Sequence, residues 1–332
     1  YYVNRFLVRD IKPVRQKLAE MAGCSAEEIA LQSNTIQALY HVIYGLDWKA
    51  GDEVILTKQD YSSVKVAYEQ LAQRVGVKLV WLDLDLPSDN EAAMVQKFAK
   101  AITPRTKLMH ITHMINWTGQ ILPVKKLCAL ARKNNIVSLV DGAQTFAHLD
   151  FKISDLGCDF YATSLHKWLC APFGTGMLYA RKDKMPLVYP LYGSPLPKND
   201  DIEKFEHVGT IMRASQLAIS NAIDFHTSIG GNLKEKRLHY LKNYWINAIK
   251  DLPGVVINTA PDLKFSCGIG HFGIEGMKSK YIDLVMIQKY RVHALAVDLA
   301  KVKGLRVSPN VFTTTQDLDR FISAVTKIVK GK

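Results

Sequence analysis

The sequence lacks the patterns that mark several large classes of protein. Its 332 residues contain no uninterrupted apolar run of the ~18 residues that a membrane-spanning helix requires. No G-x-G-x-x-G follows an early strand, so a nicotinamide-dependent oxidoreductase is not indicated. Neither internal repeats nor low-complexity tracts occur. A soluble globular protein without a membrane partner is therefore expected.

The number and spacing of the cysteines do not indicate disulfides or a metal site. The five cysteines are odd in number, widely spaced and never form C-x-x-C. A disulfide framework or a metal site is therefore not expected, and a reducing compartment such as the cytoplasm is favoured. The first five residues lack a Met and any signal-peptide pattern. This leaves open a further N-terminal stretch, and with it an export signal.

The net charge of +12 raises the question of a nucleic-acid partner. The basic residues are, however, spread among acidic ones, as in the Lys-Glu-Lys-Arg run at 234–237. No zinc-finger or RNA-binding signature accompanies them. No nucleic-acid partner is expected, and a basic surface or an anionic small ligand accounts for the charge.

Short apolar, β-branched runs alternate with longer stretches of helical period from Glu53 to Arg181. The predicted strands are 54–56, 77–84, 107–112, 136–140, 159–163 and 177–180. The predicted helices between them include 62–74, 90–101 and 124–134. This alternation predicts an α/β fold with a mostly parallel sheet covered on both faces. Ligands bind such sheets beyond the carboxyl ends of the strands.

The pattern changes beyond Ser215. Residues 215–250 have helical character and are interrupted only at Gly230-Gly231. Further strand candidates follow at 255–257 and 306–307, with helices at 280–290 and 316–329. We therefore expect a large domain over residues 1–230 and a smaller C-terminal α/β domain over 231–332.

Two segments that contain candidate catalytic residues follow predicted strands. Val140-Asp141-Gly142-Ala143-Gln144 ends one apolar run, and Ser164-Leu165-His166-Lys167-Trp168 follows the next. Taken singly, Asp141 reads as a helix cap and Lys167 as a solvated loop lysine. Together they indicate more, because a lysine amine forms an imine with an aldehyde and an acid keeps a pyridine nitrogen protonated. Packing requires neither residue, which argues against a catalytically silent scaffold.

At these residues a family resemblance is plain. Residues 31–181, with Gly209-Thr210 and the Arg-Val-Ser-Pro run at 306–309, resemble the class V aminotransferase group of pyridoxal-phosphate enzymes. That group includes isopenicillin N epimerase-like proteins and the cysteine desulfurases. The resemblance implies a fold type I enzyme with pyridoxal 5′-phosphate as cofactor and an amino acid as substrate. It also implies a homodimer with shared active sites.

The resemblance implies specific roles around the cofactor ring. Lys167 matches the lysine that forms the Schiff base and moves protons at the substrate Cα. Asp141 matches the acid that pairs with the pyridinium nitrogen, and Ala143 would lie against one face of the ring. Gln144 and Asn116 match residues near the ring hydroxyl oxygen. Asn116 also reads as a turn residue before Gly119.

Further roles concern the phosphate. Asn34, Thr35 and Ile36 match the family's phosphate-binding turn, where Ile36 replaces a second Thr and could contribute only its backbone N–H. Without the resemblance, Asn34 and Thr35 read as helix caps, and both interpretations can hold together. Ser164 and His166 would complete the phosphate site.

Three matches lie outside these segments. Thr210 matches the residue that reaches the phosphate from the neighbouring subunit. Tyr61 is the candidate for stacking on the ring, although it also reads as a helix-entry residue. Arg306 matches the arginine that binds the substrate α-carboxylate with two prongs. In isolation it reads as a surface strand residue.

These residues indicate the reaction less directly than the cofactor, because the same set of cofactor-binding residues serves epimerases, transaminases, lyases and desulfurases. A desulfurase needs a nucleophilic cysteine shortly before the carboxylate-binding arginine, and no cysteine lies between Cys267 and Arg306. Cys267 itself reads as a small buried residue in a strand. The overall pattern is most similar to the isopenicillin N epimerase-like branch, so Cα epimerisation is predicted. Transamination is the close alternative, and a lyase or desulfurase-like activity is the next.

Overall fold

The fold is known from a computed structural model, which describes residues 2–299 and 302–331, with side chains described from Ile11 onward. The chain divides into two compact units. Unit 1 comprises Tyr1–Leu84, Asn90–Met114 and Leu122–Ile229, and unit 2 comprises Asp85–Asp89, Ile115–Ile121 and Gly230–Lys332. Two short segments of the N-terminal half therefore group with the C-terminal residues.

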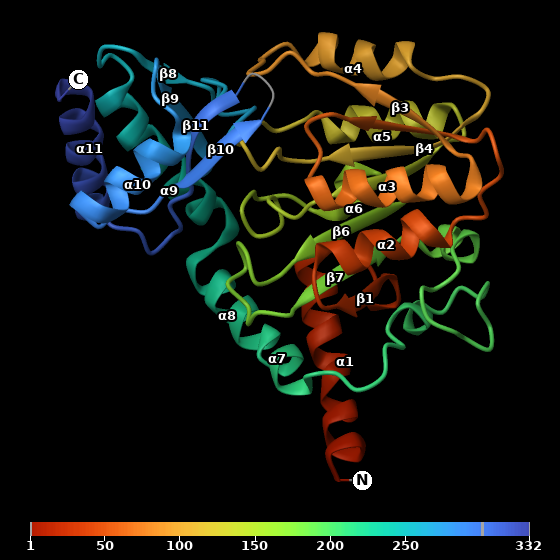
Figure 1. Cartoon of the computed structure of the whole chain (residues 1–332). Coiled ribbons are helices and arrows are strands. Elements are labelled where there is room, and N and C mark those ends of the chain that lie inside the picture. Colours follow the sequence, from red (N-terminus) through yellow and green to blue (C-terminus); the bar gives the residue numbers. More distant parts are fainter. Residues whose placement is uncertain (1, 300–301, 332) are drawn as a thin grey trace. The chain divides into compact units, whose positions relative to one another are not determined.

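Unit 1 is built on a seven-stranded sheet with the strand order β1-β7-β6-β5-β4-β2-β3 (Figure 1). Its strands are β1 (Ile29–Gln32), β2 (Glu53–Thr57), β3 (Lys78–Leu82), β4 (Thr106–Thr112), β5 (Val137–Asp141), β6 (Phe160–Ser164) and β7 (Gly176–Ala180). The run from β3 to β6 is parallel, whereas β7 pairs antiparallel with β6 and with β1. This confirms the predicted α/β class and the mostly parallel sheet.

Helices cover both faces of this sheet. The helices of unit 1 are α1 (Tyr2–Ala22), α2 (Thr35–Gly45), α3 (Ser62–Val75), α4 (Glu91–Lys100), α5 (Val124–Lys133), α6 (Ile153–Leu156), α7 (Arg213–Leu217) and α8 (Ile219–Ile229), with 3₁₀ turns at Ala26–Glu28, Lys182–Leu187 and Ile202–Phe205. Helices α2 and α3 bury Leu39 and Tyr68 in one core with Leu108 and Leu139 of the sheet. Since strand residues alternate between faces, α5, which packs on β4 and β5, covers the other side.

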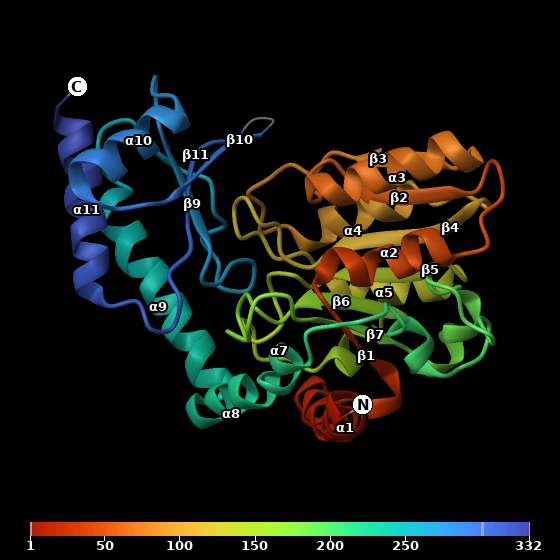
Figure 2. The ribbon, with the colours of Figure 1, turned by 60° about the horizontal axis from the view of Figure 1, so that its bottom comes forward.

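The predicted strands and helices of this region match the structure closely, but the first helix was not predicted. Helix α1 is amphipathic and carries Pro13 within it. It packs against β1, α7 and α8 (Figure 2). A helix that depends on tertiary contacts and contains a proline gives a weak local signal.

Unit 2 is a four-stranded antiparallel sheet with helices. The strands β8 (Val255–Ile257), β9 (Gly270–Ile274), β10 (Leu295–Leu299) and β11 (Val302–Val307) are ordered β10-β11-β9-β8. The helices are α9 (Gly231–Ile249), α10 (Ser279–Tyr290) and α11 (Thr315–Lys330). The rings of Trp245, Phe272 and Phe321 meet edge-to-face in its core, with centroids 5.5–6.0 Å apart.

One detail of unit 2 corrects the sequence analysis. Cys267 lies in irregular chain ahead of β9 and not in a strand. The two glycines of β9, Gly270 and Gly273, weaken its strand pattern, so the sequence predicts the strand too early, at Cys267. The expected burial of Cys267 is confirmed, since its side chain is fully buried.

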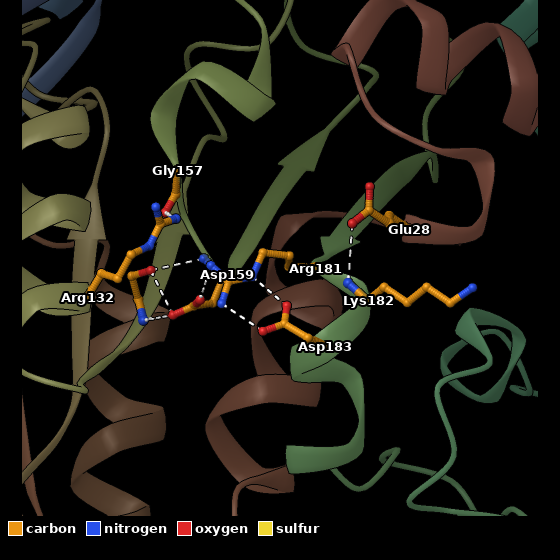
Figure 3. A network of polar contacts seen from close by, with 8 residues as sticks. Glu28, Arg132, Gly157, Asp159, Arg181, Lys182 and Asp183 are labelled. Atoms are coloured by element: carbon orange, nitrogen blue, oxygen red, sulfur yellow. Dashed lines mark hydrogen bonds and ion pairs between the residues drawn. The ribbon is translucent and has the colours of Figure 1, made fainter.

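A polar network joins the amino ends of β5 and β6 to the end of β7 (Figure 3). Asp159 accepts hydrogen bonds from the backbone N–H and the hydroxyl of Ser138, at 2.9 and 3.0 Å. Its other oxygen meets Nη1 of Arg181 at 2.9 Å. Asp183 in turn pairs with the Arg181 guanidinium. Both oxygens of the buried Asp159 carboxylate thus have partners within the protein.

Candidate functional site

Predicted site residues gather at the carboxyl edge of the parallel strands in unit 1. Asp141 is the last residue of β5 and Ser164 the last residue of β6. The two strands are parallel neighbours, with Asp141 paired to Ala162. Lys167 follows β6 by three residues, in the loop at the same edge. The position that the sequence predicted for Asp141, at the carboxyl end of a strand, is confirmed.

Asp141 is a buried acid with few partners. Its side chain is 5% exposed, and its Oδ1 accepts one hydrogen bond, from the backbone N–H of Ala143 at 2.9 Å. No other described residue forms a hydrogen bond to this carboxylate. Burial raises the pKa of Asp141, and His110, the Ala143 N–H and Lys167 oppose that shift. A carboxylate in this state fits a cationic ligand group that would compensate its desolvation.

The turn after Asp141 depends on glycine. A Cβ on Gly142 would lie 1.9 Å from Cζ of Tyr161, so no other residue fits without displacing that ring. The Tyr161 hydroxyl is held by Thr145 at 2.9 Å. This packing fixes the turn from which Ala143 and Gln144 emerge.

Gln144 has a defined orientation. Its Oε1 accepts a hydrogen bond from Nε1 of Trp168 at 2.8 Å, and the Trp168 ring stacks on His148 with centroids 3.6 Å apart. The backbone carbonyl of Gln144 also contacts Nδ1 of His148 at 2.7 Å. Because the amide oxygen is engaged, the NH₂ group of Gln144 is the end that can donate to a ligand.

The residues predicted to bind phosphate meet at the start of α2. The backbone N–H and the hydroxyl of Thr35 contact Oγ of Ser164 at 2.9 and 2.7 Å. Asn34 is the N-cap, and its side chain accepts from the N–H of Gln37 at 3.0 Å. Among the described residues, no hydrogen bond engages the backbone N–H of Ile36. An 11-residue helix with donors at its start is a favourable place for an anion.

His166 lies at the same edge and is half-buried. Its Nδ1 contacts the backbone carbonyl of Thr175 at 3.0 Å, which assigns the proton of the neutral ring to that nitrogen. Burial lowers the pKa of His166, and nearby Lys167 lowers it further. An anion bound at this edge would oppose both effects and favour a second proton on the ring.

Two predicted residues of unit 1 stand apart from these contacts. Tyr61 is the N-cap of α3, is 45% exposed and makes no capping hydrogen bond with its side chain. Thr210 is exposed and lines a cavity of about 440 Å³ with Ser33, Gln37 and Phe173. Within the described chain, no hydrogen bond joins Tyr61 or Thr210 to another predicted site residue.

The remaining two predicted residues belong to unit 2, where they contact each other. Arg306 lies in β11, and its Nη1 donates to the backbone carbonyl of Asn116 at 3.2 Å. Asn116 is part of the segment Ile115–Ile121 that groups with this unit. The contact uses the Asn116 main chain and not its amide.

Two residues near Asp141 were not predicted. His110 and Tyr68 are fully buried, and the Tyr68 hydroxyl lies 3.2 Å from Nδ1 of His110. The sequence carried a signal for His110, because a histidine inside an apolar strand needs a polar partner. It carried none for Tyr68, which lies 42 residues earlier in the chain.

Comparison with known proteins identifies the family of the chain. The family model for Aminotransferase class-V matches residues 6–321. Isopenicillin N epimerase of Streptomyces clavuligerus is 29% identical over 342 residues, covering 96% of this chain and 86% of the relative. A probable cysteine desulfurase of Halalkalibacterium halodurans is 30% identical over 340 residues, covering 94% and 80%.

Solved structures show the same fold. The apo cysteine desulfurase of Thermococcus onnurineus NA1 has a TM-score of 0.88 at 22% identity, covering 100% of this chain and 86% of that one. A C-DES mutant with glycine covalently linked to its PLP cofactor also scores 0.88 at 22% identity, covering 98% and 87%. No helix within the described residues has the length and apolarity to cross a membrane. The chain belongs to the class V aminotransferase family of enzymes.

Proposed function

We propose that this enzyme binds pyridoxal 5′-phosphate as a Schiff base on Lys167 and epimerises an amino-acid substrate at Cα. The observation that carries the proposal is the buried Asp141. Burial raises the pKa of its carboxyl group, and Lys167 lies close enough for its charge to lower that pKa. A protonated pyridine nitrogen is the kind of partner that such a carboxylate requires. The similarity to isopenicillin N epimerase over 96% of the chain supports the reaction type.

The residues at the carboxyl edge fit the parts of this cofactor. Asp141 would pair with the ring nitrogen, and Ala143 would lie against the ring. The NH₂ group of Gln144, whose oxygen is held by Trp168, would donate to the ring oxygen. Tyr61 is proposed to stack on the ring, and Asn116 to contact the ring oxygen.

The phosphate would be held at the start of α2. Thr35 and Ser164 already contact each other there, and Asn34 caps the helix. The Ile36 N–H and His166 would supply further donors. When bound, the cofactor supplies an electron sink for the electron pair released as a bond to Cα breaks.

Lys167 would carry the proton chemistry. Its amine removes a proton from the substrate Cα and returns one, as a general base and acid. Asp141 would favour positive charge on the ring nitrogen of the bound cofactor, which would lower the cost of that proton transfer. Arg306 would bind the substrate α-carboxylate through its guanidinium.

The cysteines bear on the desulfurase alternative. Burial raises the pKa of the Cys267 thiol, and nearby Glu235 adds to that shift, so this cysteine is a poor nucleophile. Cys170 is exposed and lies three residues after Lys167. Together with the desulfurase relative at 30% identity, it keeps sulfur chemistry as the second candidate.

One experiment separates the candidate reactions. The purified enzyme is incubated in D₂O with single enantiomers of a panel of amino acids and short peptides. Epimerisation predicts Cα deuterium together with the opposite enantiomer. A 2-oxo acid would identify a transaminase, and sulfide or protein-bound persulfide would identify a desulfurase or lyase. Colourless protein that takes up no pyridoxal phosphate would reject the whole proposal.

We also propose a homodimer in which Thr210 reaches the phosphate of the partner's site, since Thr210 is exposed in one chain. The widely spaced free cysteines favour a reducing compartment, and we propose the cytoplasm.

A further inference from the structure

A row of polar side chains crosses the core of unit 1 beneath Asp141. In the β4–β5 pair, Thr112 is opposite Asp141 and His110 is opposite Leu139. Residues two apart in a strand point to the same face. His110, Thr112 and Asp141 therefore share one face of the sheet, the one on which α3 buries Tyr68.

The two aspartates on this face receive different numbers of hydrogen bonds. Thr112 gives its hydroxyl to Asp60, at 2.7 Å, and Asp60 also accepts from the N–H and the hydroxyl of Thr57. Both oxygens of the Asp60 carboxylate thus accept hydrogen bonds from described residues. Among the described residues, the Ala143 N–H is the one group that donates a hydrogen bond to Asp141.

The two ring nitrogens of His110 differ in their contacts. The Tyr68 hydroxyl contacts its Nδ1 at 3.2 Å, with the two rings edge-to-face at 5.5 Å. Among the described residues, Nε2 of this fully buried imidazole has no hydrogen-bond partner. If the Tyr68 hydroxyl donates to Nδ1, the ring proton belongs on Nε2.

We propose that His110, held in this tautomer by Tyr68, is a positioning residue whose N–H dipole, rather than a direct hydrogen bond, supports the Asp141 carboxylate in its ionised form. This inference rests on the proposed function, in which Asp141 faces the cofactor ring nitrogen. In a dry site the shared proton can stay on the nitrogen or move to the carboxylate. A donor on the same face of the sheet as the carboxylate favours its ionised form, and so favours the proton on the nitrogen.

His110 lies within electrostatic range of the Asp141 carboxylate. Burial raises its pKa, and the charge of Asp60 raises it further. His110 is the largest of the influences that lower it, ahead of the Ala143 N–H and Lys167. Removing His110 would leave burial and Asp60 opposed by the two weaker influences.

The test uses cofactor labelled with ¹⁵N in the ring and three variants, His110→Phe, His110→Gln and Tyr68→Phe. In the wild type the nitrogen should show a protonated, pyridinium-type signal. In His110→Phe the signal should move toward the unprotonated position, with kcat about 10- to 100-fold lower and cofactor content unchanged. His110→Gln retains an N–H donor and should restore most of the protonated signal. Tyr68→Phe should give a smaller shift in the same direction.

A matched control separates positioning from packing. His41 of α2 is also a fully buried histidine of unit 1, and it packs edge-to-face on Phe205. His41→Phe should leave the nitrogen signal unchanged even if it destabilises the fold. If His110→Phe does not fold, His110→Gln and Tyr68→Phe decide the question.

The failures of the two proposals look different. A wild type with a protonated nitrogen, together with foldable His110 or Tyr68 variants whose signal is unchanged, overturns the role of His110 alone. A wild type without Lys167-bound cofactor overturns the proposed function itself.

Discussion

Two buried aspartates at opposite ends of neighbouring strands lie in contrasting surroundings. Asp159 precedes β6 at the amino edge of the sheet, and Asp141 ends β5 at the carboxyl edge. Their exposed fractions are nearly the same, 6% and 5%. Asp159 accepts hydrogen bonds from Ser138 and is paired with the Arg181 guanidinium, and Figure 3 shows Asp159 and Arg181 side by side. Asp141 receives one backbone N–H.

The difference shows how structural and functional carboxylates can be told apart. Burial costs both groups their hydration. The protein compensates that cost at Asp159 with a cation and two donors, so this residue ties three strands together. At Asp141 the compensation is incomplete and the pKa stays raised. Incomplete compensation at a strand's carboxyl end is typical of a site that awaits a ligand.

The largest expected effect is that of Lys167→Ala at the carboxyl edge. The variant should lose the yellow cofactor colour and at least about 10⁴-fold in turnover, because the lysine holds the cofactor and moves the proton. Lys182→Ala is the control, since Lys182 lies by the amino-edge network and pairs with Glu27 on the surface. It should keep colour and turnover. Absorbance spectra and steady-state kinetics measure both, and a coloured Lys167→Ala protein would mean that another lysine carries the cofactor.

The second prediction exchanges the two aspartates for asparagine. Asp141→Asn should lower turnover by roughly two powers of ten, since it removes the charge that pairs with the ring nitrogen. Asp159→Asn should instead lower the free energy of unfolding by about 3 kcal/mol, near the low end for a broken buried pair, because Arg181 keeps Asp183.

Kinetics and urea unfolding of both variants measure this contrast. Equal losses of turnover in the two variants, or a larger loss of stability at Asp141, would contradict the distinction between the two edges.

Of this contrast, the sequence predicted the place of Asp141 but not the contacts of Asp159. The strands of unit 1 are continuous apolar runs, so their ends, and the position of Asp141, were visible. Thr35 and Ser164, which are 129 residues apart and contact each other, were grouped by the family resemblance, since both match residues that bind phosphate. Tertiary detail could not be predicted. Nothing local links Tyr68 to His110, and strand β10 exposes Leu295 and Leu299, so it lacks a buried pattern.

The third prediction concerns stability against pH in the cofactor-free protein. The folded pKa of Asp141 is raised above its ordinary value of 3.8, so folding favours the protonated form. Stability from this group is fully present below pH 3.8 and is lost as the pH rises through the raised pKa. Asp141→Asn lacks this titration, so its stability relative to wild type should increase over the same window. Urea unfolding of both proteins from pH 4 upward measures the difference, and parallel profiles would contradict the raised pKa.

The smallest expected effect is at Thr210, outside both edges. Thr210→Ala should weaken cofactor binding by about 1 kcal/mol, roughly fivefold, because one neutral hydrogen bond to the phosphate is lost. The proposed dimer places each Thr210 in the partner's site, since a two-fold interface repeats every contact in both directions. The test is a heterodimer of one Lys167→Ala chain and one Thr210→Ala chain. Its lysine-bearing site then has a partner with an intact Thr210, so cofactor affinity there should equal that of the wild type. Affinity equal to that of the Thr210→Ala homodimer would show that Thr210 serves its own chain.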